Sequence, residues 1–471
     1  MPMASLSRWT MGYFAAALAF LLVAEGLAAA GLGDPAPGWS EPGTLILVHL
    51  VAIGWLSLAM AGALLQFVPV LAARPLALPQ LALPALVAIV AGLILVCSGF
   101  ASLAGWFALP LLLLPLGGLA LLGGFALLVV MLAGTLAGLR PGDAFAGFIR
   151  AGLLCLALAV VSGAAFATIL SGEGAALGPI ARLLPGGTRF HALLGLGGWL
   201  GLIAAGVSYR LFAMFMLAPE PPARRLRLLL VIAGAGLALA AAGLAAPLAG
   251  WEASPALAPA AAAGLAVAAG LYGRDMLALL RARRRKALEL NMRASLPAFA
   301  ALGVGILALP PVLLPGAEEP LAAAAAFLLV MGWLGGLTLA QMTKIVPFLT
   351  WLEAYAPRLG KGPAPLVKDL LAARRCAGWL ALYGAGVTLA AIALAGGGAT
   401  GFRLAMLPSL VGTAGIAAEL VRVRRLSEVK APGRPPPHEC PRLLLARTDE
   451  RSLSDAHPVP SRSRNAPAPR A

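Results

Sequence analysis

Charged residues are scarce in this chain of 471 residues. Asp, Glu, Lys and Arg make up 11% of it, whereas hydrophobic residues make up 61%. A soluble globular protein carries about 25% charged residues, so a soluble enzyme or a nucleic-acid-binding domain of this size would lack the polar surface it needs. The mean hydropathy is +0.91, and apolar runs of about 20 residues recur, each long enough to cross a bilayer. These properties predict an all-α, polytopic membrane bundle.

Cysteine and histidine, the side chains that most often ligate transition metals, are also scarce, with four of each. No two of the cysteines share a short spacing, so the sequence supports neither a disulfide framework nor a CxxC metal site. His438 and His457 lie in a polar stretch near the end of the chain. His49 and His191 lie inside predicted spans, where ionisable residues are candidates for function.

The apolar runs predict twelve spans, with the first run interrupted only by Glu25 and expected to be a retained helix. The span centres are expected near residues 20, 57, 90, 122, 160, 203, 238, 265, 304, 335, 385 and 412. Together they form a predicted membrane domain over residues 1–426. The remaining stretch, 427–471, is rich in Pro, Arg and Ser, cannot bury enough apolar surface to fold, and is expected to be a disordered cytoplasmic tail.

The loops between the predicted spans alternate in charge. One side holds clusters such as Arg281–Lys286, and only Arg182, Arg189 and Arg403 fall on the other side. The first side therefore holds 32 of the 35 Lys and Arg residues. Because Lys and Arg stay on the cytoplasmic side during insertion, this pattern predicts both termini in the cytoplasm and an integral protein of a bacterial cytoplasmic (inner) membrane. We therefore attribute the net charge of +16 to the orientation of the spans and to attraction to the lipid bilayer. A nucleic-acid partner is not expected.

A short motif recurs three times along the chain. Gly-Trp-Leu occurs around Trp55, Trp199 and Trp333, at spacings of 144 and 134 residues. A small residue follows seven positions after each Trp, and a polar residue follows eleven positions after it. These small and polar residues are Gly62, Gly206 and Ala340, and Gln66, Arg210 and Lys344.

The motif falls on the second, sixth and tenth predicted spans. Each unit would then hold four helices and keep the same orientation in the membrane, which predicts three parallel four-helix pseudo-repeats. A fourth Gly-Trp-Leu, around Trp379, lies on a span of the opposite direction and lacks the later polar residue. The extended pattern, rather than the three letters, therefore carries the prediction.

The two membrane histidines precede the motif in the first two units. His49 lies six residues before Trp55, and His191 lies eight residues before Trp199. On a helix of 3.6 residues per turn these two offsets are about 200° apart, so the rings should point differently relative to the motif. The third unit has Phe327 and Ala325 at the two positions.

With twelve helices in three units and histidines on the second and sixth, the chain resembles subunit I of the haem-copper oxidase superfamily, which includes the large subunit of nitric oxide reductase. The resemblance rests on His49…Gly54-Trp55…Gly62…Pro69 and on His191…Gly198-Trp199…Gly206…Tyr209. In that family the second, sixth and tenth helices hold metal ligands near the outer face. The resemblance implies a haem or copper cofactor held by His49 and His191.

The family's full redox centre needs more membrane histidines than this chain has, including a pair on the tenth helix. Reduction of oxygen by the family mechanism is therefore not expected. A single haem would need His49 and His191 together, or one of them with Met331 or Met60.

Two other functions stay open at this stage. A multi-pass transporter would need a polar cavity near the midplane and broken helices at matching repeat positions, whereas few polar groups lie inside the predicted spans and no chain of carboxylates crosses them. A membrane assembly or scaffold protein without cofactor would need a membrane-protein partner and no role for either histidine.

Overall fold

The backbone is almost entirely helical, because a chain in hydrocarbon must satisfy its own N–H and C=O groups. The computed structural model describes residues 8–33, 41–139, 142–172, 178, 180–252, 254–313, 319–360, 363–430 and 433–446. Capping residues mark the ends of several helices. The Asp143 carboxylate accepts the Ala146 N–H (2.9 Å) where one helix begins, and Gly31 ends another in the left-handed conformation (φ 79°).

Twelve helical stretches of the described chain are long and apolar enough to cross a membrane, and each contains one predicted span centre. The twelve-span all-α prediction is therefore confirmed. Their helices are α1 (Thr10–Ala30), α2 (Pro42–His49), η1 (Leu50–Ser57), α3 (Leu58–Ala72), α4 (Ala82–Leu103), α5 (Leu113–Leu136), α6 (Ala144–Leu170), α7 (Leu184–Ala192), η4 (Leu193–Leu202), α8 (Ile203–Met216), α9 (Ala223–Ala245), α10 (Leu257–Arg281), α11 (Leu290–Leu313), α12 (Glu319–Phe327), η6 (Leu328–Gly335), α13 (Gly336–Tyr355), α14 (Ala373–Ala395) and α15 (Ala399–Arg424).

Three of the spans change winding along their length. The second, sixth and tenth pass from an α-helix into a π-helical segment and back, at η1, η4 and η6. Each π-helical segment contains one of the Gly-Trp-Leu motifs, whereas the fourth copy, around Trp379, lies within the α-helix α14. π-Helical turns inside α-helices are rare and occur frequently at functional sites.

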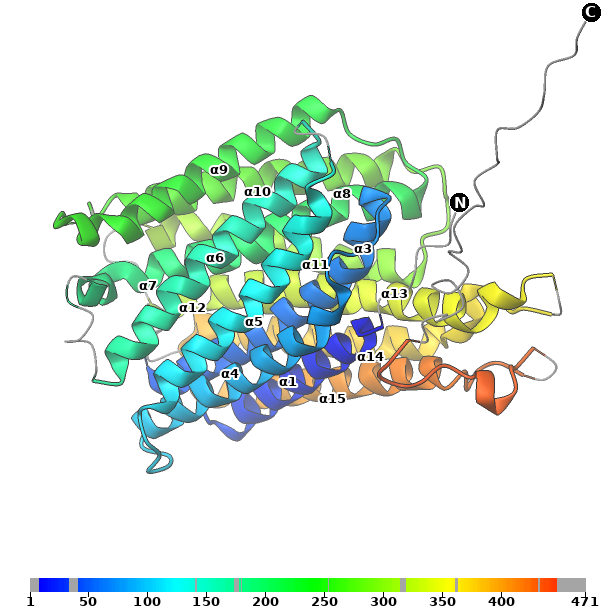
Figure 1. The fold of residues 1–471 in the computed structure, drawn as a ribbon, viewed down its shortest axis with the longest axis horizontal. Coiled ribbons are helices and arrows are strands. Elements are labelled where there is room, and N and C mark those ends of the chain that lie inside the picture. The colour runs from blue at the N-terminus through cyan, green and yellow to red at the C-terminus, as the bar shows by residue number, and fades with distance from the viewer. Residues whose placement is uncertain are drawn as a thin grey trace, which may run out of the picture.

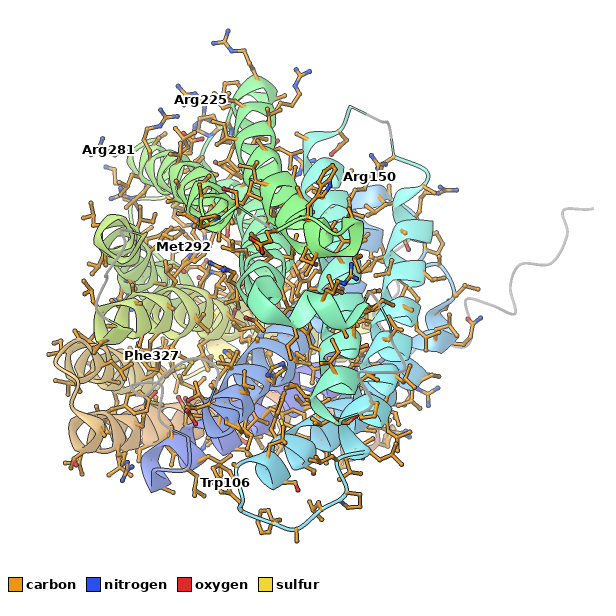
Figure 2. The ribbon with its side chains drawn as sticks, turned by 90° about the vertical axis from the view of Figure 1, so that its left-hand side faces the viewer. Trp106, Arg150, Arg225, Arg281, Met292 and Phe327 are labelled. Atoms are coloured by element: carbon orange, nitrogen blue, oxygen red, sulfur yellow. The ribbon has the colours of Figure 1, made fainter. Side chains whose placement is uncertain are left out.

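For description we divide the helices in chain order into three groups of four spans, α1 to α5, α6 to α10 and α11 to α15. In each group the first span packs on the π-helical segment, and the last two spans pack on each other. Each group also contacts the next, through α5 with α6, α10 with α11, and α15 with α1. Figure 1 shows α1 beside α15, although they stand at opposite ends of the chain. In the end view of Figure 2 the colours follow one another around the bundle.

The three π-helical segments meet at the centre of this arrangement, where each contacts the other two. Around them the α-helices place their remaining faces outward, so that many large apolar side chains such as Val231 and Leu307 are exposed. Such a surface suits lipid rather than water. We call the end at which α1 begins and α15 ends the basic end, and the other the opposite end. Figure 2 shows Arg225 and Arg281 at the margin of the bundle.

Part of the predicted C-terminal tail lies among the described residues. The Ala446 N–H donates to the Arg8 carbonyl (3.0 Å), and the Arg424 guanidinium donates to the Arg442 carbonyl and, at 3.1 Å, to Thr350. Residues 433–446 thus contact the basic end of the bundle. Residues 447–471 lie outside the described residues, and the division into a membrane domain over 1–426 and a disordered tail over 427–471 stays a prediction.

Candidate cofactor site at two membrane histidines

His49 is the last residue of α2, directly before the π-helical segment η1. Its Nδ1 lies 2.7 Å from the Leu45 carbonyl, one turn earlier in the same helix. A carbonyl only accepts, so Nδ1 carries the hydrogen and Nε2 of the neutral ring carries the lone pair. The half-buried ring lies beside Phe100 of α4, with 5.2 Å between ring centroids.

His191 lies in α7, two residues before the π-helical segment η4. Its Nδ1 is 3.1 Å from the Ser162 hydroxyl of α6. That hydroxyl already has carbonyl acceptors for its single hydrogen, at Leu158 and Ala159 (2.9 and 3.0 Å), so its oxygen accepts from Nδ1–H. A Cβ placed on Gly163 would lie 3.1 Å from Cε1 of the ring, which shows how closely the imidazole approaches α6.

The two histidines share a chemical state. Each is the eighth residue of the helix that leads into its π-helical segment. Their offsets from the Trp motif differ, and each ring packs on a different phenylalanine, His49 on Phe100 and His191 on Phe166. In both rings a fixed Nδ1–H leaves the Nε2 lone pair as the donor atom. Metal-bound histidines almost always donate their second ring N–H in this way.

The donor set limits which metal centre the histidines could form. Within the described ranges no three His, Cys, Asp or Glu side chains come together, so these residues do not build a closed four-ligand site of the structural zinc type. Two imidazole nitrogens are ligands that iron and copper centres commonly take, with further ligands from a porphyrin or a small molecule. Of the alternative ligands, Met331 is buried in η6 and Met60 is half-buried in α3.

The third group also contains a π-helical segment, but no histidine leads into it. Phe327 directly precedes η6, as His49 precedes η1, and packs on Phe402 of α15 with 5.6 Å between ring centroids. Ala325 is buried. These are the residues that the sequence places at the two histidine positions, so the third π-helical segment offers no imidazole.

The three motif tryptophans link the π-helical segments in a cycle. The Trp199 indole N–H donates to the Ser57 hydroxyl (2.9 Å), two residues after Trp55. A Cβ placed on Gly201 would meet the Trp333 ring at 3.8 Å, and one placed on Gly335 would meet Trp55 Nε1 at 3.5 Å. Each indole therefore reaches the residue two positions after another motif tryptophan.

Several polar groups of the interior could not be paired from the sequence. The Tyr209 hydroxyl donates to the buried Asp275 (3.0 Å), so Tyr209 is more than a packing residue. Glu25 accepts hydrogen bonds from Ser409 and Thr413 of α15. Ser409 and Thr413 are four residues apart on one helix, which places them on one face, but the sequence contains no signal that this face meets Glu25.

No protein-family model matches this chain, and no curated protein matches it either. The class of protein therefore follows from the spans, their packing and their apolar exterior alone. The chain is a multi-pass integral membrane protein built around twelve helices.

Proposed function

We propose that the bundle consists of three four-helix repeats around a common axis, as in the haem-copper oxidase superfamily that its sequence resembles. The support is the recurrence of contacts. The first span of each group packs on the π-helical segment, and the groups contact one another in closed order through α5–α6, α10–α11 and α15–α1. Each Trp motif coincides with a π-helical segment, and the three segments meet at the centre.

We infer that the protein is an oxidase-like member of this architecture that binds a haem or a copper ion through His49 and His191. One observation carries this inference. Both rings donate Nδ1–H to a fixed acceptor, in the helices that lead into η1 and η4, and so leave Nε2 available as a ligand. Such a cofactor would supply an iron or copper centre near one face, while the chain itself orients the two imidazoles.

The charge distribution supports an orientation for this site. The basic end carries the arginine clusters after α8 and α10, and clusters of this kind are generally retained in the cytoplasm during insertion. A bacterial inner-membrane protein with that end in the cytoplasm would hold the histidines toward the outer face, about 10 Å from the start of their helices at 1.5 Å per residue.

A transporter is the second candidate, because the π-helical segments interrupt three spans at matching positions. Against it, the place where they meet is filled by large side chains, with Trp55 and Trp199 almost fully buried. An assembly protein without cofactor would have the same packing and no requirement for the histidines.

The direct test is the absorption spectrum and the iron and copper content of the protein purified in detergent. We expect a Soret band or a stoichiometric copper ion in the native protein, and its loss in His49→Ala and in His191→Ala. His438→Ala is the matched control, because this histidine is exposed at the basic end and should leave the signal unchanged.

Each other outcome is informative. Loss of the signal in only one variant would show that one imidazole binds the cofactor alone or with a methionine. Metal-free, colourless protein that is expressed with haem and copper in excess would overturn the cofactor and leave the transporter and assembly functions.

A further inference from the structure

Four carboxylate side chains are buried within the described chain, and three of them have an arginine. Asp275 lies 3.1 Å from Arg274, Glu353 lies 2.9 Å from Arg424, and Glu419 pairs with Arg375. The fourth is Glu25, whose residue is fully buried. No ion pair joins Glu25 to any of the described Lys, Arg or His side chains.

Glu25 instead meets two hydroxyl groups of α15, the helix that packs beside α1 (Figure 1). Ser409 donates to its Oε1 at 2.7 Å, and Thr413 donates to the same oxygen at 3.1 Å. The other oxygen, Oε2, is buried and has no hydrogen-bond partner in the described part of the protein. The two carboxyl oxygens therefore have different surroundings.

Other titratable groups nearby do not neutralise this carboxyl. The Tyr383 hydroxyl of α14 donates its hydrogen to the Met331 carbonyl (2.6 Å) and not to Glu25. The Arg403 guanidinium of α15 lies against Gly31, six residues after Glu25, and forms no ion pair with Glu25. His49 is the titratable side chain of α2, and η1 and α3, which also pack on α1, carry no charged residue.

We propose that Glu25, Ser409 and Thr413 form an intramembrane proton-binding site in which Glu25 is a neutral carboxylic acid at pH 7. A carboxylate held in an apolar interior without a counter-charge is far costlier than the neutral acid. The surroundings of the two oxygens suit the acid form, because Oε1 accepts from both hydroxyls as a carbonyl oxygen, while the buried Oε2, which meets no donor that would solvate a charge, carries the proton. The site's ligand is thus H⁺, held between the first and the last helix of the bundle.

The test uses the full-length protein in detergent and N,N′-dicyclohexylcarbodiimide, an apolar reagent that adds to protonated carboxyls. At pH 7 we expect mass spectrometry to find the adduct at Glu25 and its loss in Glu25→Gln, which keeps an oxygen to accept from Ser409 and Thr413. The built-in controls are Glu353 and Glu419, which are equally buried but paired with arginine and should stay unmodified.

Infrared spectroscopy makes the test independent of access by the reagent. The protonated acid should give a carbonyl band that shifts in D₂O and is absent from Glu25→Gln, while Ser409→Ala should move the band without removing it. If the native spectrum has no band that depends on Glu25, the proposal is overturned. Protection from the reagent by sodium chloride, but not by choline chloride at equal ionic strength, would also overturn it, because a metal cation would then be the ligand.

Discussion

The π-helical segments of the first two groups and that of the third differ in chemistry but not in packing. All three contain a buried tryptophan after a glycine, and all three contact one another. The spans that lead into η1 and η4 each carry a histidine with a fixed Nδ1–H, whereas the span that leads into η6 carries Phe327 against Phe402.

This comparison separates what builds the bundle from what could give it a function. Small residues let the first span of each group approach its π-helical segment. A Cβ on Gly54, Gly198 or Gly332 would lie only 2.5 to 2.7 Å from a Cβ of α1, α6 or α11. Packing therefore recurs in all three groups, while imidazoles occur in two, so the histidines are not needed to form a π-helical segment.

If the three π-helical segments are packed equally, the largest loss of stability should come from truncating the motif tryptophans. We expect Trp55→Ala, Trp199→Ala and Trp333→Ala each to lower the free energy of unfolding by about 3–5 kcal/mol, because each empties a large, closed volume. Unfolding in mixed micelles of increasing denaturing detergent measures this free energy.

Trp251→Ala is the control for these variants, since this residue is 72% exposed and the change should stay within about 0.5 kcal/mol. If Trp333→Ala behaved like this control while the other two were severe, the third segment would not be packed as the first two are.

A smaller effect is expected from the glycine that precedes each tryptophan. In Gly54→Ala, Gly198→Ala and Gly332→Ala the new methyl group would meet Cβ atoms that cannot swing away, and overpacking of this kind costs about 1–3 kcal/mol. The thermal midpoint of each variant in detergent should fall accordingly.

The fourth Gly-Trp-Leu provides the matched control. Gly378 lies in α14 with nothing within 4 Å of a Cβ, so Gly378→Ala should be neutral or stabilising through helix propensity, by up to about 1 kcal/mol. Equal losses at Gly378 and Gly332 would mean that the packing comparison is wrong.

Much of this architecture was predictable, because the bilayer imposes a length and a composition on every span. The twelve span centres and the grouping of the motif on the second, sixth and tenth spans follow from apolar runs alone. The π-helical winding at Trp55, Trp199 and Trp333 was not predictable, because it depends on how three segments fit together at the centre rather than on local propensity.

The candidate site was predictable as residues but not as geometry. His49 and His191 stand out because ionisable groups are rare in spans. Their Nδ1–H acceptors depend on the position of the Leu45 carbonyl and on the approach of α6, which no spacing in the sequence reveals. Glu25 stands out in the same way, but its partners are 384 and 388 residues away in the chain.

The smallest effect concerns the Trp55 indole N–H, which lacks a hydroxyl acceptor of the kind that Trp199 has. Trp199 donates to Ser57, whereas Trp55 Nε1 has no partner among the described residues and faces Gly335. Gly335 has helical dihedral angles (φ −65°), so it can accept a side chain. We expect Gly335→Ser to be more stable than Gly335→Ala by about 0.5–1.5 kcal/mol, because only the serine hydroxyl can accept from Trp55.

Both Gly335 variants place a Cβ 2.8 Å from the Tyr383 hydroxyl, so their difference isolates the new hydrogen bond from the crowding they share. Gly201 controls for the hydroxyl itself, because a Cβ there meets a carbon of the Trp333 six-membered ring and not its nitrogen. Gly201→Ser should therefore gain nothing over Gly201→Ala. A serine advantage at Gly201 but not at Gly335, measured by the same detergent unfolding, would show that the indoles do not follow the cyclic arrangement.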